Sequence, residues 1–69
     1  MDKTPLTTRL LFRGKQHDVP SGMTVRDAVR RIGLPPEAIL ATRNGELLTD
    51  DVVLRPGEEI RLVAVISGG

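Results

Sequence analysis

TVRDAVRRIG (residues 24–33) is the stretch that decides the fold, because it predicts a helix with marked ends. Thr24 can cap its first turn, and Asp27 complements the positive end of the helix. Gly33 supplies a left-handed C-terminal position, and Pro35-Pro36 prevent continuation. Four apolar residues recur at the spacing i, i+3, i+4, i+7 and form one buried stripe: Val25, Ala28, Val29 and Ile32. We therefore expect a helix of roughly two to three turns.

The opposite side of this helix is basic. Arg26, Arg30 and Arg31 occupy it, and Asp27 can pair with Arg31 at a spacing of i, i+4. A surface helix needs a charged outer stripe, so we interpret these arginines as a solvated face.

Two strands are predicted before the helix. The alternation of Leu6, Thr8, Leu10 and Phe12 with the residues between them has period two, so one face is buried and the other is mostly wet. Gly14-Lys15 is interpreted as a hairpin turn into a weaker strand that runs through about Val19.

Three further strands are predicted after the helix. Residues 39–43 form a short strand, Asn44-Gly45 is the strongest hairpin dipeptide, and residues 46–48 return from it. Arg55-Pro56-Gly57-Glu58 suits a type II turn, and the apolar run from Ile60 to Ser67 is the last strand. The fold class is therefore α+β, a mixed sheet of four to five strands with one helix packed on one face.

Composition limits the class of protein. With 69 residues the chain has room for one domain, and without Cys it has neither disulfides nor thiolate metal sites. A net charge of +1 with both signs interspersed argues against a dedicated nucleic-acid binder. No apolar stretch approaches the ~20 residues of a membrane span, so we expect a cytoplasmic protein. We expect a loose segment at 1–5, a domain at 6–66 and a flexible tail at 67–69.

The diglycine Gly68-Gly69 is the strongest indication of function. Two final glycines arise by chance in roughly 0.5% of chains of average composition. Residues without Cβ make a thin tail that can enter a narrow enzyme channel and bring its carboxylate close to a phosphate. Catalytic residues are hard to assign elsewhere, because His17 is the single His and Gly14-Lys15 lacks the rest of a phosphate-binding loop. We therefore expect no enzyme activity, no bound cofactor and no metal site, and take the Gly69 carboxylate as the reactive group.

Four stretches in this order and spacing resemble the ubiquitin-like β-grasp sulfur carriers, a family that includes ThiS, MoaD and bacterial carriers for transfer-RNA thiolation. They are residues 24–28, Arg43-Asn44-Gly45-Glu46, residues 54–60 and Ser67-Gly68-Gly69. Residues 63–66 lack the prolines typical of MoaD before its diglycine, and the ending Ile66-Ser67-Gly68-Gly69 is most similar to the thiolation carriers. The resemblance implies a β-grasp fold.

The resemblance also implies partners. An adenylyltransferase related to ubiquitin-activating enzymes would adenylate Gly69 with ATP and magnesium, a persulfide sulfurtransferase would supply sulfur, and a downstream enzyme would accept it. The product would be a Gly69 thiocarboxylate. The pathway stays open between thiamine, molybdopterin and transfer-RNA thiolation. A ubiquitin-like modifier joined to substrate lysines and a β-grasp binding module without chemistry are the alternatives.

Docking requires a folded surface beside the tail. Leu11, Val63 and Val65 lie on the outward parity of their strands if Leu10, Phe12, Leu62 and Ala64 point inward, so they can form an exposed apolar patch. Ile66 and Ser67 would extend it toward Gly68 and Gly69.

Overall fold

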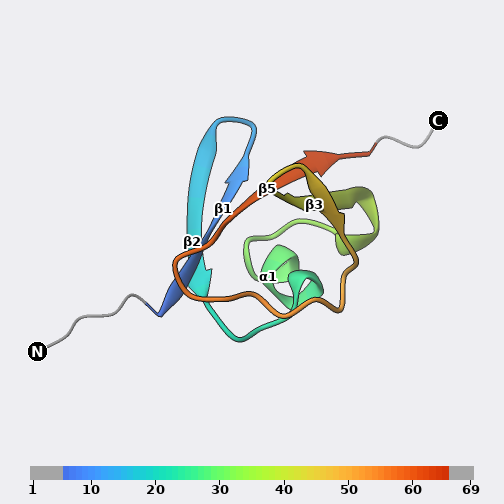
Figure 1. The fold of residues 1–69 in the computed structure, drawn as a ribbon. Coiled ribbons are helices and arrows are strands. Elements are labelled where there is room, and N and C mark those ends of the chain that lie inside the picture. The colour runs from blue at the N-terminus through green and yellow to red at the C-terminus, as the bar shows by residue number, and fades with distance from the viewer. Residues whose placement is uncertain (1–5, 66–69) are drawn as a thin grey trace, which may run out of the picture.

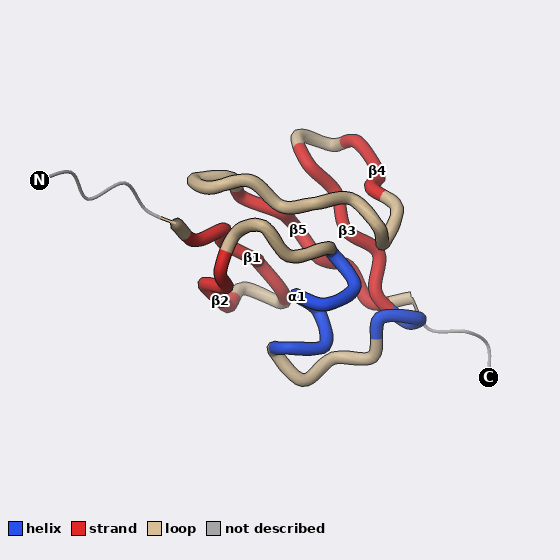
Figure 2. Tube along the Cα trace, turned by 90° about the horizontal axis from the view of Figure 1, so that it is seen from below, coloured by secondary structure: helices blue, strands red, loops and turns tan. Residues whose placement is uncertain are grey.

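The computed structural model describes residues 6–65, which form one sheet and one α-helix. The elements, in chain order, are β1 (Thr7–Phe12), β2 (Lys15–Pro20), α1 (Val25–Arg31), the 3₁₀ helix η1 (Pro36–Ala38), β3 (Ile39–Arg43), β4 (Glu46–Leu48) and β5 (Glu59–Ala64). The five strands are ordered β2-β1-β5-β3-β4, with β1 and β5 parallel and the other neighbours antiparallel (Figure 1). Figure 2 shows α1 against one side of this sheet. The predicted α+β architecture is confirmed.

The ends of α1 are built as the sequence predicts. The Thr24 hydroxyl accepts a hydrogen bond of 3.2 Å from the Asp27 N–H. At the other end Gly33 has φ 88°, its N–H donates to the Arg30 carbonyl at 3.0 Å, and the Leu34 N–H donates to the Val29 carbonyl at 3.1 Å. This pair of bonds is a Schellman motif, which satisfies two carbonyls that the helix itself leaves open.

The core lies between α1 and the sheet. Its buried apolar residues are Leu10, Val19, Val25, Ala28, Val29, Ala41, Leu54, Ile60 and Leu62. The inward parity of β1 and β5 is confirmed, since Leu10 and Leu62 are buried and Phe12 packs against the same cluster. Leu6 was expected on this face but is 68% exposed, and it precedes β1, which begins at Thr7.

One buried polar group fixes a loop to the core. Thr8 is fully buried on the inward face of β1, where its hydroxyl donates to the Arg55 carbonyl at 2.6 Å. The bond holds the loop before β5 against β1, and it satisfies a hydroxyl whose burial would otherwise be costly.

The first hairpin turn is one residue earlier than predicted. Phe12 pairs with Lys15, so the two turn residues are Arg13 and Gly14 rather than Gly14 and Lys15. Both have positive φ, 51° and 79°, as a type I′ turn requires. The Asn44-Gly45 turn is confirmed, with φ values of 52° and 82°.

Two other expectations need correction, and one short element was not predicted. The Glu59–Ala64 strand begins one residue before Ile60 and ends before Val65, so the last strand is shorter than the apolar run. Residues 36–38 form a short 3₁₀ helix, whereas Pro35-Pro36 were interpreted only as the end of the preceding helix. No Asp27–Arg31 ion pair forms within residues 6–65. The ion pair of α1 in that part of the chain joins Arg26 to Asp50, with Nη2 2.8 Å from Oδ2.

None of the helices in residues 6–65 has the length and apolar character needed to cross a membrane.

Candidate functional site

The predicted reactive end begins where the described structure stops. Gly68 and Gly69, and the docking residues Ile66 and Ser67, lie outside the described residues. The last described residue is Val65, whose N–H donates to the Ala38 carbonyl at 2.7 Å. The surface around Val65 is therefore the nearest described part of the candidate site.

The predicted apolar patch lies on the face of the sheet that α1 does not cover. Val63 is 49% and Val65 42% exposed, and Leu11 is half-buried. Leu40 also belongs to this surface, although the sequence pattern did not single it out. It is 43% exposed and is the direct cross-strand partner of Val63. Leu40 precedes the buried Ala41 in β3, and because side chains alternate between the two faces of a strand, Leu40 points outward. The pairing of β3 with β5 then places it beside Val63. We call these four residues the outer patch.

A hollow with basic sides borders the outer patch. It has a volume of about 440 Å³ and lies between the β1–β2 turn and β5, with Leu11, Arg13, Arg61 and Val63 among its lining residues. Leu11 and Arg61 are direct neighbours in the parallel β1–β5 pairing. The Arg13 guanidinium carbon lies 5.1 Å from the centroid of the Phe12 ring, a cation–π distance that holds this side chain at the turn.

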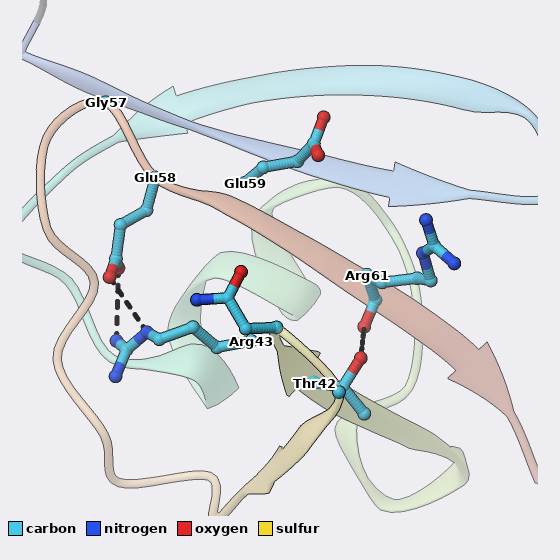
Figure 3. A pocket seen from close by; sticks show the side chains of 8 residues that line it. Thr42, Arg43, Gly57, Glu58, Glu59 and Arg61 are labelled. Carbon is cyan, nitrogen blue, oxygen red and sulfur yellow. Dashed lines mark hydrogen bonds and ion pairs between the residues drawn. The ribbon is translucent and has the colours of Figure 1, made fainter.

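A second hollow, also of about 440 Å³, lies nearer the start of β5 (Figure 3). Arg43 and Glu58 point toward one another in it, with Nε 2.8 Å from Oε2 and Nη2 donating to Oε1 at 3.0 Å. Glu58 Oε1 also accepts from the Arg55 N–H at 3.2 Å. Their side chains are only 24% and 19% exposed, so this pair ties the β3–β4 hairpin to the loop before β5. We assign it a structural role.

Two ionisable groups near the start of α1 have shifted pKa values, and local hydrogen bonds explain both shifts. The hydrogen bond to Asp50 raises the pKa of the Arg26 guanidinium above its usual value. The Thr49 hydroxyl, 2.6 Å from Oδ1 of Asp51, lowers the pKa of that carboxyl. Both groups keep their ordinary charge near neutral pH. Within residues 6–65 there is no cluster of three or more His, Cys, Asp or Glu that could hold a metal ion.

Sequence comparison gives two matches of wide coverage. A model of the ThiS family matches residues 7–69. The sulfur carrier protein TtuB of Thermus thermophilus is 33% identical over 55 residues, which is 80% of this chain and 85% of that protein.

Comparison of folds gives ubiquitin-like structures. A computationally designed protein based on human erythrocytic ubiquitin superposes with a TM-score of 0.68 at 28% identity, over 91% of this chain and 95% of the designed one. The thiamine biosynthesis protein ThiS of Geobacter metallireducens superposes with a TM-score of 0.59 at 20% identity, over 88% of this chain and 99% of that protein. The predicted β-grasp fold is thereby confirmed.

Proposed function

The chain belongs to the ThiS family, and on that premise we propose that it is a sulfur carrier whose Gly69 carboxylate becomes a thiocarboxylate. The observation that carries the proposal is the extent of the family match, which runs from residue 7 through the diglycine to Gly69. The similarity to TtuB, a sulfur carrier protein, supports it.

Activation would begin at the carboxylate. A carboxylate is a poor acyl donor because oxide is its leaving group, so the carboxylate oxygen must first attack the α-phosphate of ATP and release pyrophosphate. A persulfide sulfur then attacks the acyl carbon and AMP leaves, which gives an acyl disulfide. A second thiol attacks the cysteine-bound sulfur of that disulfide and forms a new disulfide with it. The S–S bond to the acyl-bound sulfur breaks, and the thiocarboxylate leaves with the electron pair. ATP, magnesium and the thiols belong to the partner enzymes, so this chain is a co-substrate rather than an enzyme.

The folded domain contributes recognition. The outer patch lies at the end of β5, directly before the tail, and its exposed valines and Leu40 offer apolar area for burial by the adenylyltransferase. An adenylyltransferase bound at this patch would lie close to the Gly69 carboxylate, because four residues follow Val65 in the sequence. Residues 66 and 67 would continue the contact into the enzyme's channel.

The proposal is tested with ATP–pyrophosphate exchange by the ubiquitin-activating-type adenylyltransferase of the same organism. The full chain should support exchange, and a chain that lacks Gly69 should not, because the acyl group is displaced from the α-phosphate. Exchange that is equally fast with both chains would contradict the proposal.

The pathway we favour is transfer-RNA thiolation, because the ending Ile66-Ser67-Gly68-Gly69 resembles carriers of that branch. A ubiquitin-like modifier is the second candidate, favoured by the 28% identity to a ubiquitin-based design. Both functions need the same adenylate. They differ in whether sulfur or a lysine amine displaces AMP.

A further inference from the structure

We propose that the basic hollow beside the outer patch binds a partner surface in which a carboxylate flanks an aliphatic side chain. The inference rests on the proposed function, since the partner is the adenylyltransferase that activates Gly69. The observation behind it is the makeup of the hollow: two arginines, Arg13 and Arg61, lie beside apolar Leu11 and Val63, and no acidic residue lines it.

Charge is divided along the outer face of the sheet. At the start of β5, Glu59 is the direct neighbour of Arg9, and Arg9 lies 3.9 Å from Asp18, so the cation there has local counter-charges. Farther along, Arg61 has no ion pair within residues 6–65, and Figure 3 shows its side chain directed away from the Arg43–Glu58 pair. Arg13 has none in that part of the chain either. The two cations at this end therefore have charge to offer to a partner.

The position of the hollow suits a role in activation. Phe12 and Leu62 are neighbours in the parallel pairing, so the β1–β2 turn and the end of β5 lie at the same end of the sheet (Figure 1). Gly69 follows Val65 by four residues, which span at most about 14 Å. A partner that contacts Arg13 and Arg61 is thus close enough to receive the Gly69 carboxylate.

The chemistry of the hollow favours a protein over a nucleic acid. The two arginines can pair with a carboxylate at the rim of a partner's interface, and the aliphatic side chains beside them can pack against an apolar side chain of that partner. A polar rim around an apolar centre is the usual arrangement of a protein interface. A nucleic acid would need a longer basic stripe or stacking aromatics, and Phe12 is the sole aromatic residue of the chain.

The test measures the KM for this chain in ATP–pyrophosphate exchange with the same adenylyltransferase as the probe. Arg61→Gln should raise the KM about tenfold with little change in kcat, because a close charge pair across the interface is lost. Arg13→Asn should act in the same direction, and Asn tolerates the positive φ of 51° at that position. Arg31→Gln is the matched control, since Arg31 is an exposed arginine on α1, in the other layer.

Salt gives an independent readout. Raising the salt concentration should increase the KM of the wild-type chain and of Arg31→Gln, and increase it less for Arg61→Gln. Thermal melts check that the variants stay folded.

Equal KM values for Arg61→Gln, Arg13→Asn and Arg31→Gln would overturn the inference while the proposed function stands. Binding of transfer RNA that weakens in Arg61→Gln would also overturn it. A wild-type chain that supports no exchange would refute the proposed function itself.

Discussion

Leu62 and Val63 are neighbours on β5 that face opposite sides of the sheet, so truncating each one should separate stability from docking. Leu62 is 4% exposed and belongs to the core cluster between α1 and the sheet. Removing a buried leucine side chain leaves a cavity, and Leu62→Ala should lower the free energy of unfolding by about 2–5 kcal/mol. A chain of 69 residues has roughly 3–10 kcal/mol in total, so this is a large share.

The matched change, Val63→Ala, should be much milder. Val63 is 49% exposed, and the group removed is smaller, so we expect a loss under about half that of Leu62→Ala. In docking the order reverses, because Val63 faces outward and Leu62 does not. Val63→Ala should raise the KM in ATP–pyrophosphate exchange, whereas folded Leu62→Ala should retain a near-normal KM.

Circular dichroism melts measure the first effect. For a domain of this size about 1 kcal/mol corresponds to ~4–8 °C, so Leu62→Ala should lower the midpoint by at least about 8 °C. Exchange assays are then run below both midpoints. An unchanged midpoint for Leu62→Ala would show that the inward parity of β5 is wrong, and a KM raised equally by both variants would show that Val63 has no particular role in docking.

Three further predictions concern the tail, the helix cap and the ion pair. Adding one residue after Gly69 should leave the melt unchanged and abolish ATP–pyrophosphate exchange, and retained exchange would contradict a role for its carboxylate. Thr24→Ala should cost about 1 kcal/mol of stability in a urea titration, because the cap of α1 is lost, whereas a neutral result would exclude a stabilising cap. Glu58→Gln should cost about 1–3 kcal/mol, since Arg43 loses the counter-charge of a mostly buried pair. Asp18→Asn, at an exposed ion pair, is the control, and equal costs would refute the structural role of Glu58.

Local signals in the sequence predicted much of the fold. The ends of the helix, the Asn44-Gly45 turn and the bounds of the strand at 39–43 depend on residues that are close in the chain, and the structure has all three. The first turn was misplaced because Arg13, a residue that rarely adopts positive φ, shares it with Gly14. Both candidate dipeptides contain Gly14, which suits a type II′ turn in first position and a type I′ turn in second position. The pairing of Phe12 with Lys15 selects the second arrangement, which a local pattern does not specify.

Long-range contacts could not be predicted in the same way. The Arg43–Glu58 pair joins residues that are 15 positions apart, and its geometry depends on how the loop before β5 folds back. Leu40 joins the outer patch only because β3 pairs with β5 at Val63. Of the predicted docking residues, Val63 and Val65 are exposed and Leu11 is half-buried, while the predictions for Ile66 and Ser67 lie outside the described residues.

The sulfur-carrier proposal is tested most directly by the intact mass of this chain, purified after co-expression with its adenylyltransferase and a persulfide donor. We predict a population heavier by the difference between one sulfur and one oxygen atom, with the change mapped to Gly69. Replacing Lys3 and Lys15 with Arg should leave this population unchanged, because a carrier needs no lysine of its own. A chain that never carries the thiocarboxylate under these conditions, and is found instead joined to lysines of other proteins, would contradict the account.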